Sequence, residues 1–124
     1  MLMRGNLDRP IDDEPFPGVQ RTSFSSPRST VTQYRFAPHS EFPRHVHDQE
    51  QITIVQEGQV EFSVGGSVHQ LTEGDWVVVE PRIEHGLTAG LRGARVLAIV
   101  SPARVLADEF DVVAGSEPGL EAGS

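Results

Sequence analysis

Short segments rich in β-branched and aromatic residues alternate with turn residues through most of this sequence. β-branched and aromatic residues favour extended strands, and Gly, Pro and Ser favour the turns between strands. The expected strands cover residues 19–24, 30–37, 44–56, 59–64, 67–72, 75–80, 85–89 and 93–100. Turns are expected at SSPR, at PHSEFP, at EGQ (57–59) and at VGGS (64–67). Many short strands without a convincing helical period predict an all-β barrel or sandwich.

The chain of 124 residues has room for one small domain. Its first residues are polar, acidic and rich in proline, so we expect residues 1–17 to be flexible. The barrel is expected over residues 18–113, with a short helical turn in SPARVLADEF and an added strand in EFDVV. Residues 114–124, AGSEPGLEAGS, have the composition of a flexible tail.

Composition excludes several classes of chemistry. The chain has no cysteine, which rules out disulfides, thiolate nucleophiles and cysteine zinc sites. All ten cations are arginines, so Schiff-base chemistry and a P-loop lysine are ruled out as well. A formal charge of -8 argues against nucleic acid or an anionic membrane as partner. With no apolar run of about 20 residues and no signal-peptide core, we expect a cytoplasmic protein.

Four side chains have spacings that suit one metal ion. His45, His47 and Gln51 have the same parity, so a strand over residues 44–55 would present all three on one face. A fourth ligand, His85, would come from another strand brought opposite by curling of the sheet. Three imidazoles and a carboxamide suit a divalent transition metal such as Zn, Ni, Fe, Mn or Cu. His39 and His69 are interpreted as ordinary surface or core residues.

Two stretches that contain these residues resemble the cupin motifs. Residues 39–58, HSEFPRHVHDQEQITIVQEG, are similar to the first motif, with His45 and His47 in the histidine positions and Gly58 at its end. His39 stands where Gly is usual. Residues 74–89, GDWVVVEPRIEHGLTA, are similar to the second motif and keep the separation of Gly74 from His85, although Glu80, Arg82 and Ala89 replace Pro, Gly and Asn. The resemblance covers roughly residues 30–100 and implies a small jelly-roll barrel of two antiparallel sheets.

Gln51 departs from the Glu that the first cupin motif usually has. The carboxamide of Gln51 keeps an oxygen ligand but lacks the negative charge of a carboxylate. A bound divalent ion would therefore keep its full positive charge. Such an ion is a stronger Lewis acid and is held less tightly. Cations that prefer oxygen ligands, Mg and Ca, are therefore poor candidates.

The HxHxxEQ form of the first motif, with SPAR after the last core strand, is similar to small cupins that open the ring of unsaturated uronates. This likeness implies a sugar-acid substrate and a metal that acts as a Lewis acid. The same ligand set also occurs in cupins that resemble dioxygenases, in other lyases and in zinc-binding sensor domains. We therefore expect a lyase, isomerase or dioxygenase type of enzyme, with a non-catalytic binding or sensing module as the alternative.

Residues around the expected metal site could supply further chemistry. Tyr34 and Arg44 are the candidates for proton transfer or for anchoring a carboxylate. Thr53 shares the inward parity of Gln51 and, with Tyr34, is expected to line the substrate pocket. Trp76 stands beside three valines and is expected to fill the core. A homodimer is expected, with the N-terminal segment and strand 19–24 covering a sheet edge of a second copy.

Overall fold

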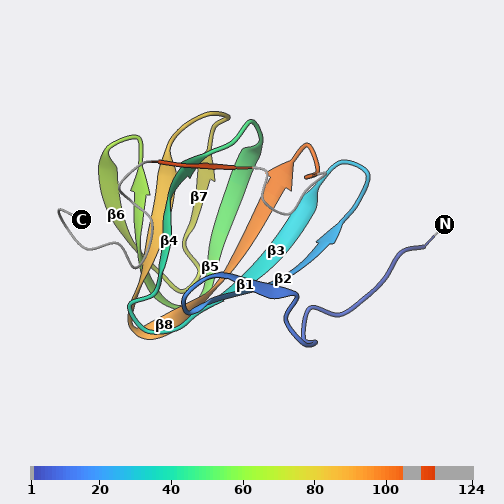
Figure 1. Ribbon diagram of the computed structural model, residues 1–124, viewed down its shortest axis with the longest axis horizontal. Coiled ribbons are helices and arrows are strands. Elements are labelled where there is room, and N and C mark those ends of the chain that lie inside the picture. Colours follow the sequence, from blue (N-terminus) through green and yellow to red (C-terminus); the bar gives the residue numbers. More distant parts are fainter. Residues whose placement is uncertain (1, 105–109, 114–124) are drawn as a thin grey trace.

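The computed structural model describes residues 2–104 and 110–113, which form nine strands and no helix. The strands are β1 (Asp13–Phe16), β2 (Val19–Ser25), β3 (Thr30–Phe36), β4 (Glu41–Val46), β5 (Glu50–Val64), β6 (Ser67–Thr72), β7 (Trp76–Val79), β8 (His85–Ser101) and β9 (Asp111–Val112). All pairings are antiparallel, and the strands belong to one sheet that curls into an open barrel (Figure 1). The expected all-β jelly-roll class is confirmed.

Two long neighbouring strands, β5 and β8, hold the barrel together. The C-terminal part of β8 lies between β3 and the first half of β5, and β7 follows on the other side of β5. The N-terminal part of β8 lies between β4 and the second half of β5, which also pairs with β6. Both strands therefore run from one half of the curled sheet into the other.

The bend in β5 lies at Gly58, where the sequence predicted a hairpin turn. That prediction is wrong, because β5 continues through EGQ with register shifts against β8 on both sides of Gly58. Gly58 has a φ of 79°, and a Cβ atom there would lie 2.2 Å from the carbonyl oxygen of Gly93. Only glycine fits such a backbone conformation and such a close approach. The turn expected at VGGS is present at Gly65 and Gly66.

The core fills the concave side of the sheet. Its aromatic part is built around Phe42, whose ring packs edge-on against Phe16 at 4.8 Å and against Tyr34 at 5.6 Å between ring centroids. The buried hydrophobic residues are Val19, Tyr34, Phe36, Phe42, Val55, Val60, Phe62, Val79, Leu87, Ala89, Val96, Ala98 and Val100. Trp76 is not among them: its side chain is 67% exposed on the convex face, so the expected core position is wrong.

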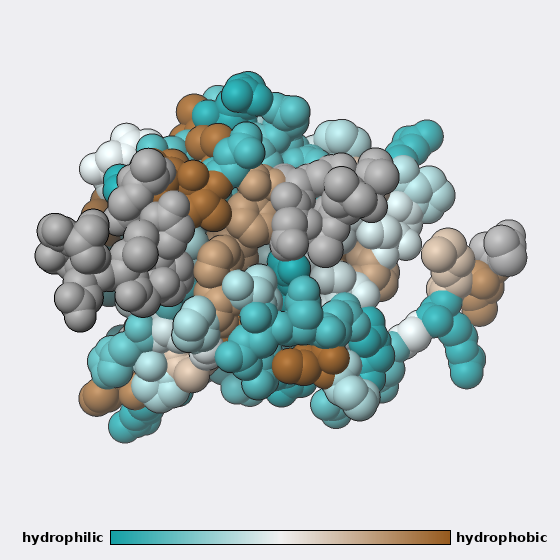
Figure 2. All heavy atoms as spheres, viewed as in Figure 1, coloured by the Kyte–Doolittle hydropathy of each residue, from teal (hydrophilic) through white to brown (hydrophobic). Residues whose placement is uncertain are grey.

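Both ends of the described chain add short strands. β1 begins at Asp13, inside the segment expected to be flexible, and pairs with β2. A bidentate ion pair from Arg21 to Asp13, at 2.6 and 2.8 Å, accompanies this pairing. β9 lies in EFDVV, where a strand was expected, while residues 105–109 and 114–124 lie outside the described part. Just before β1, Asp8, Arg9 and Asp12 contact β2 and β3. The end of the chain projects from the barrel and carries hydrophobic side chains (Figure 2), of which Leu2 is 81% and Met3 65% exposed.

Candidate metal centre

Adjacent strands bring His45 and His85 together. β4 pairs with β8, and in this register His45 stands directly opposite His85. β4 ends at Val46, so His47 lies in the short connection before β5 begins at Glu50. The sequence predicted one strand carrying three ligands and a fourth from a strand across the barrel. The structure instead interrupts that strand after Val46 and makes His85 a neighbour of His45.

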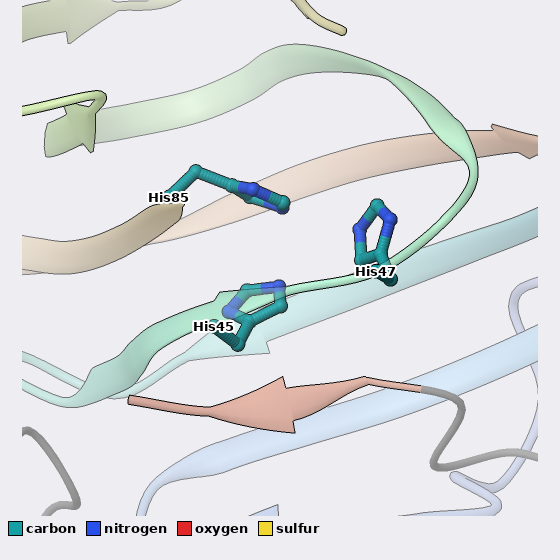
Figure 3. A group of neighbouring side chains, drawn as sticks. All are labelled: His45, His47 and His85. Atoms are coloured by element: carbon teal, nitrogen blue, oxygen red, sulfur yellow. The ribbon is translucent and has the colours of Figure 1, made fainter. Parts of the chain in front are cut away.

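The rings of His45, His47 and His85 point toward one another from these positions (Figure 3). One ligand atom from each lies within 4.8 Å of the others. The centroids of the His45 and His85 rings are 4.2 Å apart, and the His47 ring lies 4.8 Å from that of His85. All three side chains are buried, with at most 6% exposed. A buried cluster of this kind could hold a metal ion.

Backbone carbonyl groups fix which nitrogen of each ring carries its proton. Nδ1 of His45 donates to the carbonyl oxygen of Pro43 at 2.8 Å. Nδ1 of His47 donates to Gln49 at 3.0 Å, and Nδ1 of His85 to Ile83 at 2.9 Å. Since a carbonyl oxygen only accepts, each neutral ring keeps a lone pair on Nε2. Carbonyl partners of this kind are the usual orienting groups behind metal-binding histidines.

Gln51 adds an oxygen atom to the same cluster. Its Oε1 lies 3.0 Å from Nε2 of His47 and 3.3 Å from Nε2 of His85. Its Nε2 donates to Oγ1 of Thr53 at 2.9 Å, which turns the oxygen toward the histidines. The oxygen and both ring nitrogens are acceptors, so the contacts are favourable only with a cation among them. Ligands about 2.1 Å from one ion stand roughly 3.0–3.4 Å apart, so these residues fit a transition metal.

Burial keeps the histidines neutral. It lowers the pKa of His45 to about 2, with the neighbouring His85 as the next cause. It lowers the pKa of His85 to about 4, and it also lowers the pKa of His47. The positive charge of Arg104 contributes to all three shifts. Neutral imidazole is the form that coordinates metals, so at neutral pH no proton competes strongly with a cation.

Of the other predicted site residues, two lie beside this cluster and one does not. Tyr34 and Thr53 line the small cavity on the inner side of His45 and His85. Their place in a substrate pocket stays a prediction. Arg44 is half exposed on the opposite side of β4, and its Nη1 donates to Glu84 at 3.0 Å. Its catalytic role stays a prediction. The remaining two histidines, His39 and His69, are exposed and belong to no metal-binding cluster among the described residues.

Arg104 is a residue of this site that sequence reasoning did not assign. It follows β8 in the SPAR stretch, and its backbone N–H donates to Oγ1 of Thr30 at 2.8 Å. Its Nε is buried and has no hydrogen-bond partner among the described residues. The effect of its charge on the pKa values of the three histidines indicates that it lies near them. The SPAR likeness was the sequence signal for this residue, but it assigned Arg104 no role.

Two cavities adjoin the cluster and differ in size. The inner cavity, enclosed mainly by Phe42, Phe62 and Leu87, measures about 30 Å³, which is room for a water molecule. The outer hollow measures about 410 Å³ and is lined by Val46, His47, Asp48, Gln49, Arg82, Phe110 and Asp111. A small molecule therefore has space on the outer side of His47.

The structure so far defines a curled β-sheet with a buried histidine cluster near the start of β8 that could hold a metal ion. The profile of the family described as "Cupin domain" matches residues 32–100, more than half of the chain. The chain therefore belongs to the cupin family. The matched range contains all three histidines and Gln51, and it ends before Arg104.

Solved structures support the same fold. KdgF from Halomonas sp. is 26% identical, with a TM-score of 0.74 over 81% of this chain and 92% of that one. An RmlC-like cupin from Shewanella frigidimarina is 27% identical, with a TM-score of 0.73 over 79% and 87%. Salicylate 1,2-dioxygenase from Pseudaminobacter salicylatoxidans, at 17% identity and a TM-score of 0.67, is matched over 70% of this chain and 27% of that one and shows the fold alone. None of the curated proteins compared with the chain matches it.

The described residues contain no helix with the length and hydropathy needed to cross a membrane.

Proposed function

We propose that this cupin is a metal-dependent enzyme acting on a small oxygen-rich acid, with a sugar acid as the substrate class. The observation that carries the proposal is the convergence of the ring nitrogens of three histidines and the oxygen of Gln51, near the positive charge of Arg104. His45, His47, His85 and Gln51 would hold the ion. A divalent transition metal bound there would supply Lewis acidity toward a carbonyl or hydroxyl oxygen, or would activate dioxygen if it is redox-active.

Gln51 sets the charge of this site. A neutral carboxamide leaves the positive charge of a cation uncompensated, and the described residues around the inner cavity include no carboxylate. Thr53 holds the carboxamide in the binding orientation through its hydroxyl. The uncompensated charge of a bound cation would favour an anionic ligand, which the substrate itself would provide.

Arg104 is the candidate anchor for the negative group of the substrate. Its charge reaches all three histidines, and its buried Nε has a free hydrogen-bonding capacity among the described residues. Guanidinium groups bind carboxylates through paired N–H donors. The likeness to KdgF at 26% identity, together with the HxHxxEQ and SPAR motifs, supports a uronate as the acid.

The outer hollow is where we place the substrate. Its lining includes His47 and three charged residues, of which Arg82 is paired with Asp48 and Asp111 is exposed. Tyr34 lies in the inner cavity, where a single water molecule could connect its hydroxyl to the site. Its role as an acid or base would therefore be exercised through water.

A sensing module is the second candidate, and the small inner cavity favours it. With about 30 Å³ beside His45 and His85, the inner side of the site cannot accept a substrate. A module of this type would bind metal and a small anion without turnover, and ligand binding would change a contact with a partner.

The experiment compares Arg104→Gln and Arg104→Lys with Arg92→Gln, a matched exposed arginine outside the site. Purified protein loaded with Zn, Ni, Fe, Mn or Cu is assayed against unsaturated uronates and small aromatic acids. We expect turnover that requires metal, a loss of kcat/KM of about 10²-fold in Arg104→Gln, and partial recovery in Arg104→Lys. Metal binding without turnover on any of these acids would contradict the enzyme and favour the sensor.

A further inference from the structure

Arg82 has an unusual backbone conformation next to the histidine cluster. Its φ is 64°, in the left-handed region that strains residues other than glycine. Its backbone N–H donates to the carbonyl oxygen of His47 at 2.9 Å. The next residue, Ile83, accepts the hydrogen bond from Nδ1 of His85. The turn therefore contacts two of the three histidines. Glycine at position 82 would keep the N–H and remove the strain, so the side chain is what distinguishes arginine there.

The side chain of Arg82 pairs with Asp48, and stability alone does not explain this pair. Nη1 of Arg82 donates to Oδ1 of Asp48. The side chain of Arg82 is 69% exposed and that of Asp48 is 81% exposed. An ion pair between such exposed groups contributes less to the free energy of folding than a left-handed arginine costs. Backbone strain that is not offset locally indicates a functional residue.

The outer hollow shows what the pair could serve. The charged residues of its lining are Asp48, Arg82 and Asp111, and Asp48 directly follows His47. The chain as a whole has a formal charge of -8, which already disfavours the approach of an anion. Without Arg82, two uncompensated carboxylates would line the hollow beside the histidine. The guanidinium group compensates one of them.

We propose that Arg82 determines the specificity of the outer hollow for acids, because it neutralises Asp48 beside His47. The inference rests on the proposed function and adds what selects the charge of the substrate. Arg82 acts through Asp48 in this role and stays bound to it. Its role is therefore distinct from that of Arg104, the candidate anchor of the substrate.

Calorimetric titration of the zinc-loaded protein with D-galacturonate and D-galactose tests the inference, because the two sugars differ in the carboxylate. Arg82→Gly should weaken galacturonate binding roughly 5-fold at low salt, a modest effect because solvent screens exposed charges. Galactose binding should not change. Adding Asp48→Asn to Arg82→Gly should restore galacturonate affinity to within about 2-fold of the wild type. His39→Gly is the matched control, since His39 has a φ of 63°, is exposed and lies outside the hollow.

Salt and stability separate this role from a merely structural one. The effect of Arg82→Gly on galacturonate should fade in about 0.5 M NaCl, because the Debye length becomes a few Å. The urea midpoint of Arg82→Gly should equal or exceed that of the wild type, since the substitution removes the left-handed strain. A lower midpoint together with an effect that salt does not change would overturn the inference in favour of a structural role.

The binding data also separate this inference from the proposed function. Equal galacturonate affinity in the wild type and Arg82→Gly, or no recovery on adding Asp48→Asn, would overturn the inference and leave the proposed function standing. A zinc-loaded wild type that binds no galacturonate would overturn the inference as well. The turnover assay on unsaturated uronates and aromatic acids then decides the proposed function by itself.

Discussion

Gln51 shows how a single side chain sets the character of this site. Its oxygen stands among imidazole nitrogens that all present lone pairs, and its nitrogen is held by Thr53. Without a cation, the carboxamide would gain by turning over and donating its N–H groups to the histidines. The orientation seen here is therefore the one that suits a bound metal.

Changing Gln51 to Glu should raise metal affinity by roughly 10-fold, because a carboxylate adds charge attraction to the same oxygen ligand. Thr53→Val should lower affinity by about 10–100-fold, because it removes the hydroxyl that orients the carboxamide. Competition titration with a chromophoric chelator measures both. Equal affinities in the wild type and Thr53→Val would show that the hydroxyl does not position the ligand.

The lowered histidine pKa values predict how the metal-free protein responds to pH. In the unfolded chain these histidines have a pKa near 6.5, whereas in the folded chain His45 and His85 have values of about 2 and about 4. The unfolded state therefore binds more protons as pH falls below 6.5, and stability present above that pH is lost toward pH 4. Between pH 7 and pH 5 the loss should be about 2 kcal/mol for each histidine.

Urea unfolding of the chelator-treated protein at several pH values measures this loss. His85→Asn should have a shallower dependence on pH than the wild type. His69→Asn is the matched control, because His69 is exposed and should leave the dependence unchanged. Identical pH profiles in the wild type and His85→Asn would contradict the assigned cause.

At the scale of elements, the bend that lets β5 and β8 serve both halves of the barrel depends on Gly58. Gly58→Ala would force a Cβ atom into the Gly93 carbonyl and also strain a positive φ. Gly66→Ala is the matched control, with a φ of 88° and no atom within 4 Å of the added Cβ. We expect a loss of about 1 kcal/mol for Gly66→Ala and at least ~3 kcal/mol for Gly58→Ala, by urea unfolding. Equal losses would show that the close approach at Gly58 does not matter.

Most of the strand segments could be predicted from the local sequence, but the continuation of β5 through Gly58 could not. The segments at 19–24, 30–37 and 67–72 agree with β2, β3 and β6 within a residue or so. EGQ was interpreted as a turn because glycine with polar neighbours favours turns, and only the packing of β5 on β8 reveals a bulge there. Trp76 was misplaced for a similar reason, since alternation along a short apolar strand does not tell which face is inside.

The site, like the strands, could be predicted from local sequence only in part. The His-x-His spacing and His85 identified the buried cluster, because ligand spacing is a local property of the sequence. The placement of His45 directly opposite His85 depends on the register of β4 on β8, which spacing does not encode. Arg104 lies beyond the last core strand, so its approach to the cluster is a result of the whole fold.

At the scale of the whole molecule, the two faces of one curled sheet have different roles in this account. The concave face encloses the core and the histidine cluster, and the convex face carries the exposed side chains of Phe24, Trp76 and Val78. Substitutions on one face should therefore leave the property of the other unchanged. Trp76→Glu, on the convex face, should leave metal affinity unchanged in a competition titration, whereas His45→Ala should lower it.

The central claim is that three histidines and Gln51 bind one transition metal ion. Elemental analysis of chain purified without an affinity tag or chelator, followed by titration with Zn, Ni, Fe, Mn and Cu, tests it most directly. The account predicts about one transition metal per chain in the wild type and a loss of binding of at least ~10²-fold in His85→Ala with the strand content kept. Wild-type chain that carries no transition metal and takes up none on titration would contradict it.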